Sequence, residues 1–168
     1  MAGLSELDLY RAYYRKQHDI AREFYLPCMA RSTTYDRAVG FYSSAVYIIA
    51  WGSLKSFVAN GGKMRLIASP RLTEKDLEAI SEGYEGRTDS ELAESLQREF
   101  FRLLENQYLS KPARVLAYLI ANKFMEFRIA LVEDADARTK KMFHDKVGIF
   151  VDEFGNKVAF KGSMNETY

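Results

Sequence analysis

Apolar residues recur along the chain with the two periods that distinguish strands from helices. Residues 63–68 alternate between polar and apolar, as in a half-buried strand. Other short segments are of the same kind, so strands are expected over residues 37–42, 63–68, 126–132, 141–151 and 157–161. A turn over Asn60-Gly61-Gly62 precedes the second of them, and a turn over Asp152–Asn156 joins the last two.

Longer segments with a helical period lie before and between these strands. The expected helices cover residues 5–24, 43–59, 73–82, 88–104 and 112–123. Several begin with a capping signal, namely Ser5 with Asp8, Thr73 with Asp76, Thr88 with Glu91, and Pro112 in a first turn. Pro27 is expected to end the first helix.

The order of these elements predicts an α/β fold in which helices flank a mixed sheet. A chain of 168 residues fits one domain, over residues 1–168. Residues 162–168 look like a loop that opens a helix, yet no helix follows them in the sequence. We therefore expect the chain to be the N-terminal fragment of a longer protein.

Composition narrows the class of protein. The apolar fraction of 48% supports a core, and a net charge of +1 excludes a disordered tail or a strongly basic DNA-coating protein. The single cysteine, Cys28, allows no intrachain disulfide and is expected to be a small core or surface thiol. Apolar runs such as Ala45–Trp51 are far too short to span a bilayer, so we expect a cytoplasmic protein without membrane contact.

The two histidines of the chain differ in their surroundings. His18 lies among apolar residues at helical spacing, which favours a structural or surface role. His144 lies on an expected strand with Lys146 two residues later, so both side chains should point to the same face of the sheet. An imidazole beside an ammonium makes a poor core pair but a good anion site.

The segment after His144 strengthens this interpretation. Beyond the expected strand 157–161, the chain reads Gly162-Ser163-Met164-Asn165. His-x-Lys followed by Gly-Ser-x-Asn resembles the signature of the phospholipase D superfamily, and the resemblance is close over residues 142–167. The region Arg37–Ala68 also resembles the front of such domains where they precede helicase modules in bacterial proteins.

Two departures from that signature concern an aspartate and a spacing. The family aspartate would fall on Val151, and the nearest carboxylate, Asp152, is expected on the opposite face. The gap before Gly162 is also longer, which the turn before the last strand accommodates. Some nuclease members of the superfamily lack the aspartate, so the departure favours that branch. Glu166 could replace it, although an acidic residue in the first turn of a helix explains Glu166 equally well.

The resemblance implies a reaction and the residues that perform it. His144 would attack phosphorus to give a phosphohistidine, while Lys146 and Asn165 hold the non-bridging oxygens and Ser163 donates a hydrogen bond. A second histidine would protonate the leaving oxygen. Because the chain contains no other His-x-Lys, that histidine is expected from a second copy in a two-fold homodimer. Neither a metal nor another cofactor is expected.

The segment before His144 turns from acidic to basic. Arg138, Lys140 and Lys141 would guide a phosphate backbone into the site or else form a solvated loop. The expected function is a metal-independent phosphodiesterase, with DNA as the favoured substrate and a helicase-like or restriction protein as its setting. Two alternatives stay open: a catalytically silent dimerisation or DNA-binding module of such a protein, and a hydrolase of lipids or small phosphodiesters.

Overall fold

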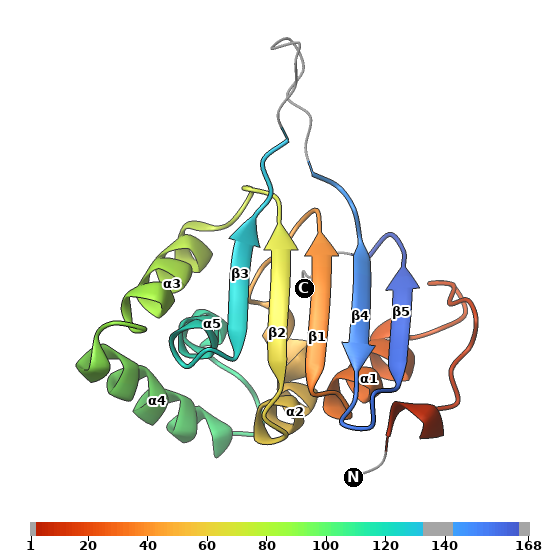
Figure 1. Ribbon diagram of the computed structural model, residues 1–168, viewed down its shortest axis with the longest axis horizontal. Coiled ribbons are helices and arrows are strands. Elements are labelled where there is room, and N and C mark those ends of the chain that lie inside the picture. The colour runs from red at the N-terminus through yellow and green to blue at the C-terminus, as the bar shows by residue number, and fades with distance from the viewer. Residues whose placement is uncertain (1–2, 133–142, 165–168) are drawn as a thin grey trace.

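A five-stranded mixed sheet forms the centre of the protein (Figure 1). The structure is a computed structural model that describes residues 3–132 and 143–164. Its strands lie in the order β3-β2-β1-β4-β5. They are β1 (Thr34–Val39), β2 (Lys63–Ala68), β3 (Met125–Ile129), β4 (Val147–Val151) and β5 (Lys157–Lys161). The first three are parallel, whereas β4 is antiparallel to β1 and β5 is antiparallel to β4.

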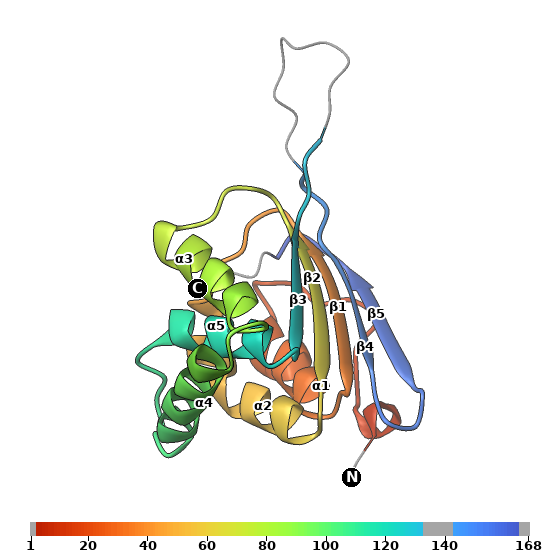
Figure 2. The same ribbon diagram turned by 60° about the vertical axis from the view of Figure 1, so that its left-hand side comes forward.

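Five α-helices pack on one face of this sheet (Figure 2). They are α1 (Leu26–Ala30), α2 (Val46–Ala59), α3 (Glu74–Glu85), α4 (Ser90–Leu104) and α5 (Pro112–Ala121). A 3-10 turn, η1 (Leu4–Glu6), and a π-helical turn, η2 (Ala21–Tyr25), precede them. The expected α/β class with a mixed sheet is confirmed. None of the helices in the described part of the chain is long and apolar enough to cross a membrane.

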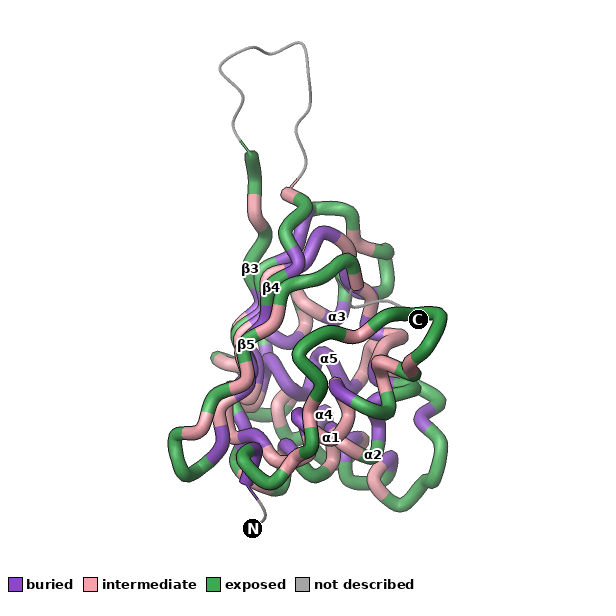
Figure 3. Tube along the Cα trace, turned by 90° about the vertical axis from the view of Figure 1, so that its right-hand side faces the viewer, coloured by how far each residue is buried: buried purple, intermediate pink, exposed green. Residues whose placement is uncertain are grey.

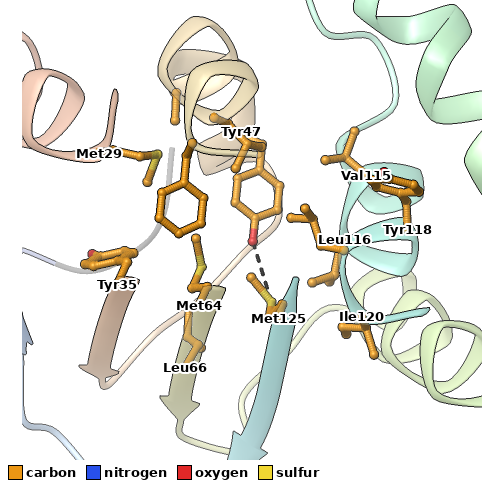
Figure 4. Close-up of a cluster of buried hydrophobic side chains, with 14 of the residues drawn as sticks. Met29, Tyr35, Tyr47, Met64, Leu66, Val115, Leu116, Tyr118, Ile120 and Met125 are labelled. Atoms are coloured by element: carbon orange, nitrogen blue, oxygen red, sulfur yellow. Dashed lines mark hydrogen bonds between the residues drawn. The ribbon is translucent and has the colours of Figure 1, made fainter. Parts of the chain in front are cut away.

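The hydrophobic core fills the space between the sheet and the helices (Figure 3). On β2 the burial alternates with every residue, so Met64 and Leu66 point inward. Figure 4 shows them beside Met125 of β3, whose sulfur accepts a hydrogen bond from Tyr47 of α2 at 3.9 Å. The period-two pattern of the sequence therefore marks which face of the sheet carries the helices.

Three helices begin at capping residues or at a proline, and one of these capping residues differs from the one expected. The Thr73 hydroxyl caps α3 by accepting a hydrogen bond from the Asp76 backbone N–H at 3.1 Å. The cap of α4 is Asp89 and not Thr88, because the Asp89 carboxylate accepts from two backbone N–H groups of the first turn. Pro112 stands in the first turn of α5, where its missing N–H costs nothing.

The helix expected over residues 5–24 is wrong. Residues 7–19 are irregular, and the helical turns begin only at η2, which continues into α1. Tertiary anchoring explains the difference, because the buried Leu4 donates its backbone N–H to the Asp152 carboxylate, 2.7 Å away at the β4–β5 turn. From there the chain passes beside β5 in an irregular conformation before η2 begins. Pro27 lies near the start of α1 and does not end a helix.

Three strand boundaries also differ from expectation. The strand expected over residues 37–42 lies three residues earlier, and β3 ends at Ile129. The strand expected over residues 141–151 begins only at Val147, so His144 and Lys146 precede it. Residues 141 and 142 lie outside the described residues. Because residues 144–146 precede β4, the alternation of a strand does not determine where their side chains point.

Candidate active site

Three of the sequence-predicted residues, His144, Lys146 and Ser163, lie among the described residues, at one edge of the sheet. Because β4 is antiparallel to β1, the carboxyl end of β1 and the start of β4 lie next to each other there (Figure 1). After β1 the chain continues through α2 to β2 on one side, while β4 occupies the other side. The carboxyl ends of β1 and β2 and the start of β4 therefore meet at this edge of the sheet.

His144 is exposed at this edge and packs against Gly40, the residue that follows β1. A Cβ atom on Gly40 would lie 3.1 Å from the imidazole Nδ1 and 3.3 Å from the His144 Cα. The ring of Phe41 meets the imidazole edge-on, with 6.3 Å between the ring centres. Glycine at position 40 thus allows the close approach that orients the imidazole.

Lys146 is buried, with 6% of its surface exposed, although it carries an ammonium group. The ammonium donates a hydrogen bond to the backbone carbonyl of His144 at 2.9 Å. Within residues 3–132 and 143–164 it forms no ion pair with a carboxylate. A buried cation whose partner among the described residues is a neutral carbonyl is costly unless an anion joins it, so the position suits an anionic ligand.

The Gly-Ser segment lies alongside Lys146. The backbone N–H of Gly162 donates to the Lys146 carbonyl at 3.0 Å, which continues the β4–β5 ladder past Val147 and Lys161. Ser163 follows directly and is exposed. The turn between β4 and β5, with Gly155 at φ 84°, therefore brings the two halves of the motif together. Asn165, Glu166, Arg138, Lys140 and Lys141 lie outside the described residues.

Arg37 is a buried cation of this edge that sequence reasoning missed. It points inward from β1 with 3% of its surface exposed. Its Nη2 donates to the Met164 carbonyl at 2.6 Å, and its guanidinium lies 5.1 Å from the ring centre of Phe160. Arg37 therefore anchors the segment that carries Ser163. An arginine at an inward position of a strand was the available signal.

Asp152 lies at the opposite end of β4, roughly 20 Å of extended chain from Lys146. Its carboxylate accepts hydrogen bonds from the backbone N–H groups of Leu4, Phe154 and Asn156 and from the Asn156 amide. Burial raises the pKa of Asp152, but these hydrogen bonds outweigh it and hold the pKa below its ordinary value of 3.8. Asp152 is thus a structural residue of the β4–β5 turn.

Two other candidates also have structural roles. His18 is bonded through Nδ1 to the Glu23 carboxylate at 3.0 Å, and this bond lowers the pKa of Glu23. Cys28 is fully buried, and burial raises the pKa of its thiol to about 12, so the thiol stays protonated and unreactive. No group of three or more His, Cys, Asp or Glu side chains among the described residues could hold a metal ion.

Comparison with known proteins adds no relative. The chain matches no protein-family model, no curated protein and no solved structure.

Proposed function

We propose that the domain is a metal-independent phosphodiesterase that cleaves DNA through a phosphohistidine on His144. The buried ammonium of Lys146 is the observation that carries this proposal. A phosphodiester placed beside it would supply a counter-charge that the described residues do not, and charge-assisted hydrogen bonds to phosphate are among the strongest in proteins. His144 lies two residues before Lys146 in the sequence, and its exposed imidazole packs against Gly40.

The proposed reaction has two displacements at phosphorus. A ring nitrogen of His144 attacks, a P–N bond forms, and the P–O bond to the leaving strand breaks as that oxygen takes a proton from a second imidazolium. Water then gives its proton to the second imidazole and attacks phosphorus, which breaks the P–N bond and frees His144. Lys146 and the Ser163 hydroxyl stabilise charge on the non-bridging oxygens. The second imidazole belongs to His144 of another copy, since His18 is bonded to Glu23.

The test is cleavage of end-labelled DNA by the wild-type chain in excess EDTA. We expect cleavage to persist, His144→Ala to abolish it, and His18→Gln, which changes the other histidine, to retain it. Denaturing the wild-type protein during turnover should trap a labelled adduct that acid hydrolyses and base does not. Cleavage that stops in EDTA and returns with magnesium would overturn the phosphohistidine mechanism.

A second candidate is a catalytically silent dimerisation or DNA-binding module of a helicase-like or restriction protein. Val151 at the position of the family aspartate favours it, as does the hydrogen bond that turns the Lys146 ammonium toward the His144 backbone. This function predicts DNA binding without cleavage, and His144→Ala would then leave binding unchanged. The same assay therefore separates the two proposals.

A further inference from the structure

A groove of about 850 Å³ lies beside β5, and its lining includes Ser163. The irregular segment over residues 9–17 forms one wall, and residues 158–164 form the other. The π-helical turn η2 supplies Phe24 and Tyr25 to its floor. Figure 1 shows the irregular segment on the outer side of the sheet, beyond β5. We refer to this feature as the β5 groove.

The charge of the β5 groove differs from that of the whole chain. Its lining carries four cationic side chains and, among the described residues, no carboxylate, whereas the net charge of the chain is only +1. The cations are Arg11, Arg15, Lys16 and Lys161. Asp19 and Glu23, which follow the segment, lie outside the lining and are bonded to Arg22 and His18. The groove is therefore electropositive and complementary to a polyanion.

Two tyrosine rings stand exposed between these cations. Tyr10 is 62% exposed and Tyr14 is 61% exposed, although both are large aromatic residues. Contacts within the segment hold them there, because the Tyr10 backbone N–H donates to the Tyr13 hydroxyl at 3.1 Å and the Tyr14 carbonyl accepts from His18 at 2.9 Å. Tyr13 packs inward on Phe24, while the Tyr10 ring contacts the rings of Tyr13 and His18 along one side and keeps most of its surface exposed to a ligand.

We infer that the β5 groove binds a single-stranded polynucleotide and leads it to the active site. Alternating cations and exposed aromatic rings match a backbone of phosphates with unstacked bases. In a duplex the base faces are already stacked, so these tyrosines would find no partner there. The inference rests on the proposed function in one respect, since it names the substrate class of that same site.

Binding can be measured by fluorescence anisotropy on the full chain carrying His144→Ala, which removes the proposed cleavage. The probes are labelled oligothymidylate and oligouridylate of about 20 nucleotides and a DNA duplex of equal length. We expect both single strands to bind more tightly than the duplex, and the ratio of the two single strands shows whether DNA or RNA is preferred.

The double variant Tyr10→Ala/Tyr14→Ala should weaken single-strand binding at least about tenfold. Tyr10→Phe/Tyr14→Phe keeps both rings and should bind as the parent does. Arg11→Ala/Arg15→Ala/Lys16→Ala should lower the slope of log affinity against log salt by about 2. Two control variants remove the same kinds of side chain outside the groove and should bind as the parent does. Tyr108→Ala removes a ring that is 79% exposed, and Lys75→Ala/Arg98→Ala/Arg102→Ala removes three exposed cations.

The outcomes separate this inference from the proposed function. Equal affinity of the tyrosine double variant and its parent, or a duplex that binds as tightly as the single strands, overturns the β5 groove as the binding site. Wild-type protein that binds single strands through the groove but cleaves none supports the groove and contradicts the phosphodiesterase. A circular dichroism melt of each variant identifies any that has lost its fold, and the phenylalanine variant then decides the role of the rings.

Discussion

The Lys146 ammonium donates its hydrogen bond to the backbone carbonyl of His144, 2.9 Å away, and is nearly inaccessible to solvent. The cation thus contacts the backbone of the residue that carries the exposed imidazole. Stability and activity should respond in opposite directions when this cation is removed.

We expect Lys146→Met to lower DNA cleavage by about 10²–10³-fold, the usual effect of deleting one electrostatic donor to a transition state. The free energy of unfolding should stay the same or rise, because a buried charge that has no carboxylate partner among the described residues is replaced by an apolar side chain of similar length. Urea denaturation and cleavage assays measure the two effects. Lys157→Met, at the far end of β5, is the control and should keep full activity. A large loss of stability in Lys146→Met would show that the ammonium supports the fold.

Gly40→Ala tests the packing of the imidazole. The new methyl group would come within 3.1 Å of Nδ1, so the ring must shift by a few tenths of an ångström. We expect cleavage to fall about tenfold or more, because small misplacements of a reacting group are costly. Gly52→Ala on α2 is the matched control, since no described atom outside its own helix lies within 4 Å, and it should stabilise the protein by about 0.5–1 kcal/mol. Unchanged cleavage in Gly40→Ala would contradict the assigned position of His144.

Co-refolding equal amounts of wild-type and His144→Ala chains tests the shared site. If each site needs His144 from both copies, only the wild-type homodimers cleave, and activity falls to about one quarter of the wild-type value. Independent sites would leave about one half. Sedimentation equilibrium measures the assembly itself, and a monomer at high concentration would rule out the two-fold site.

Asp152 should give the protein an acid-sensitive component of stability. Its folded pKa lies below the ordinary value of 3.8, so the carboxylate contributes its full stability above about pH 4 and loses it as the pH falls through the folded pKa. We expect Asp152→Asn to lower the urea midpoint at pH 7 and to reduce the difference between pH 7 and pH 3. Glu78→Gln, which changes an exposed carboxylate on α3, should behave as wild type at both pH values. A pH dependence that Asp152→Asn leaves intact would assign the acid sensitivity to another group.

Several elements follow from the sequence because local patterning and tertiary packing agree there. Residues 63–68 and 157–161 form strands over the expected ranges, since their alternation fits a sheet with one face under helices. The hairpin turn over Asp152–Asn156, with Gly155 at positive φ, is local chemistry as well. That turn is enough to place Gly162 and Ser163 beside Lys146, so this half of the candidate site could be expected from the sequence.

Only the tertiary structure decided the rest, because long-range contacts override local preference. Residues 5–24 have a helical pattern, but the bond between Leu4 and Asp152 ties the start of the chain to a turn almost 150 residues away, and this leaves residues 7–19 irregular. The same contact makes Asp152 structural. No local pattern predicts that Arg37 donates to the Met164 carbonyl, or that His144 packs against Gly40. Each pair joins segments more than 100 residues apart. The sequence by itself determined the sheet pattern and the chemistry of the motif, and the packing of distant segments determined which side chains surround it.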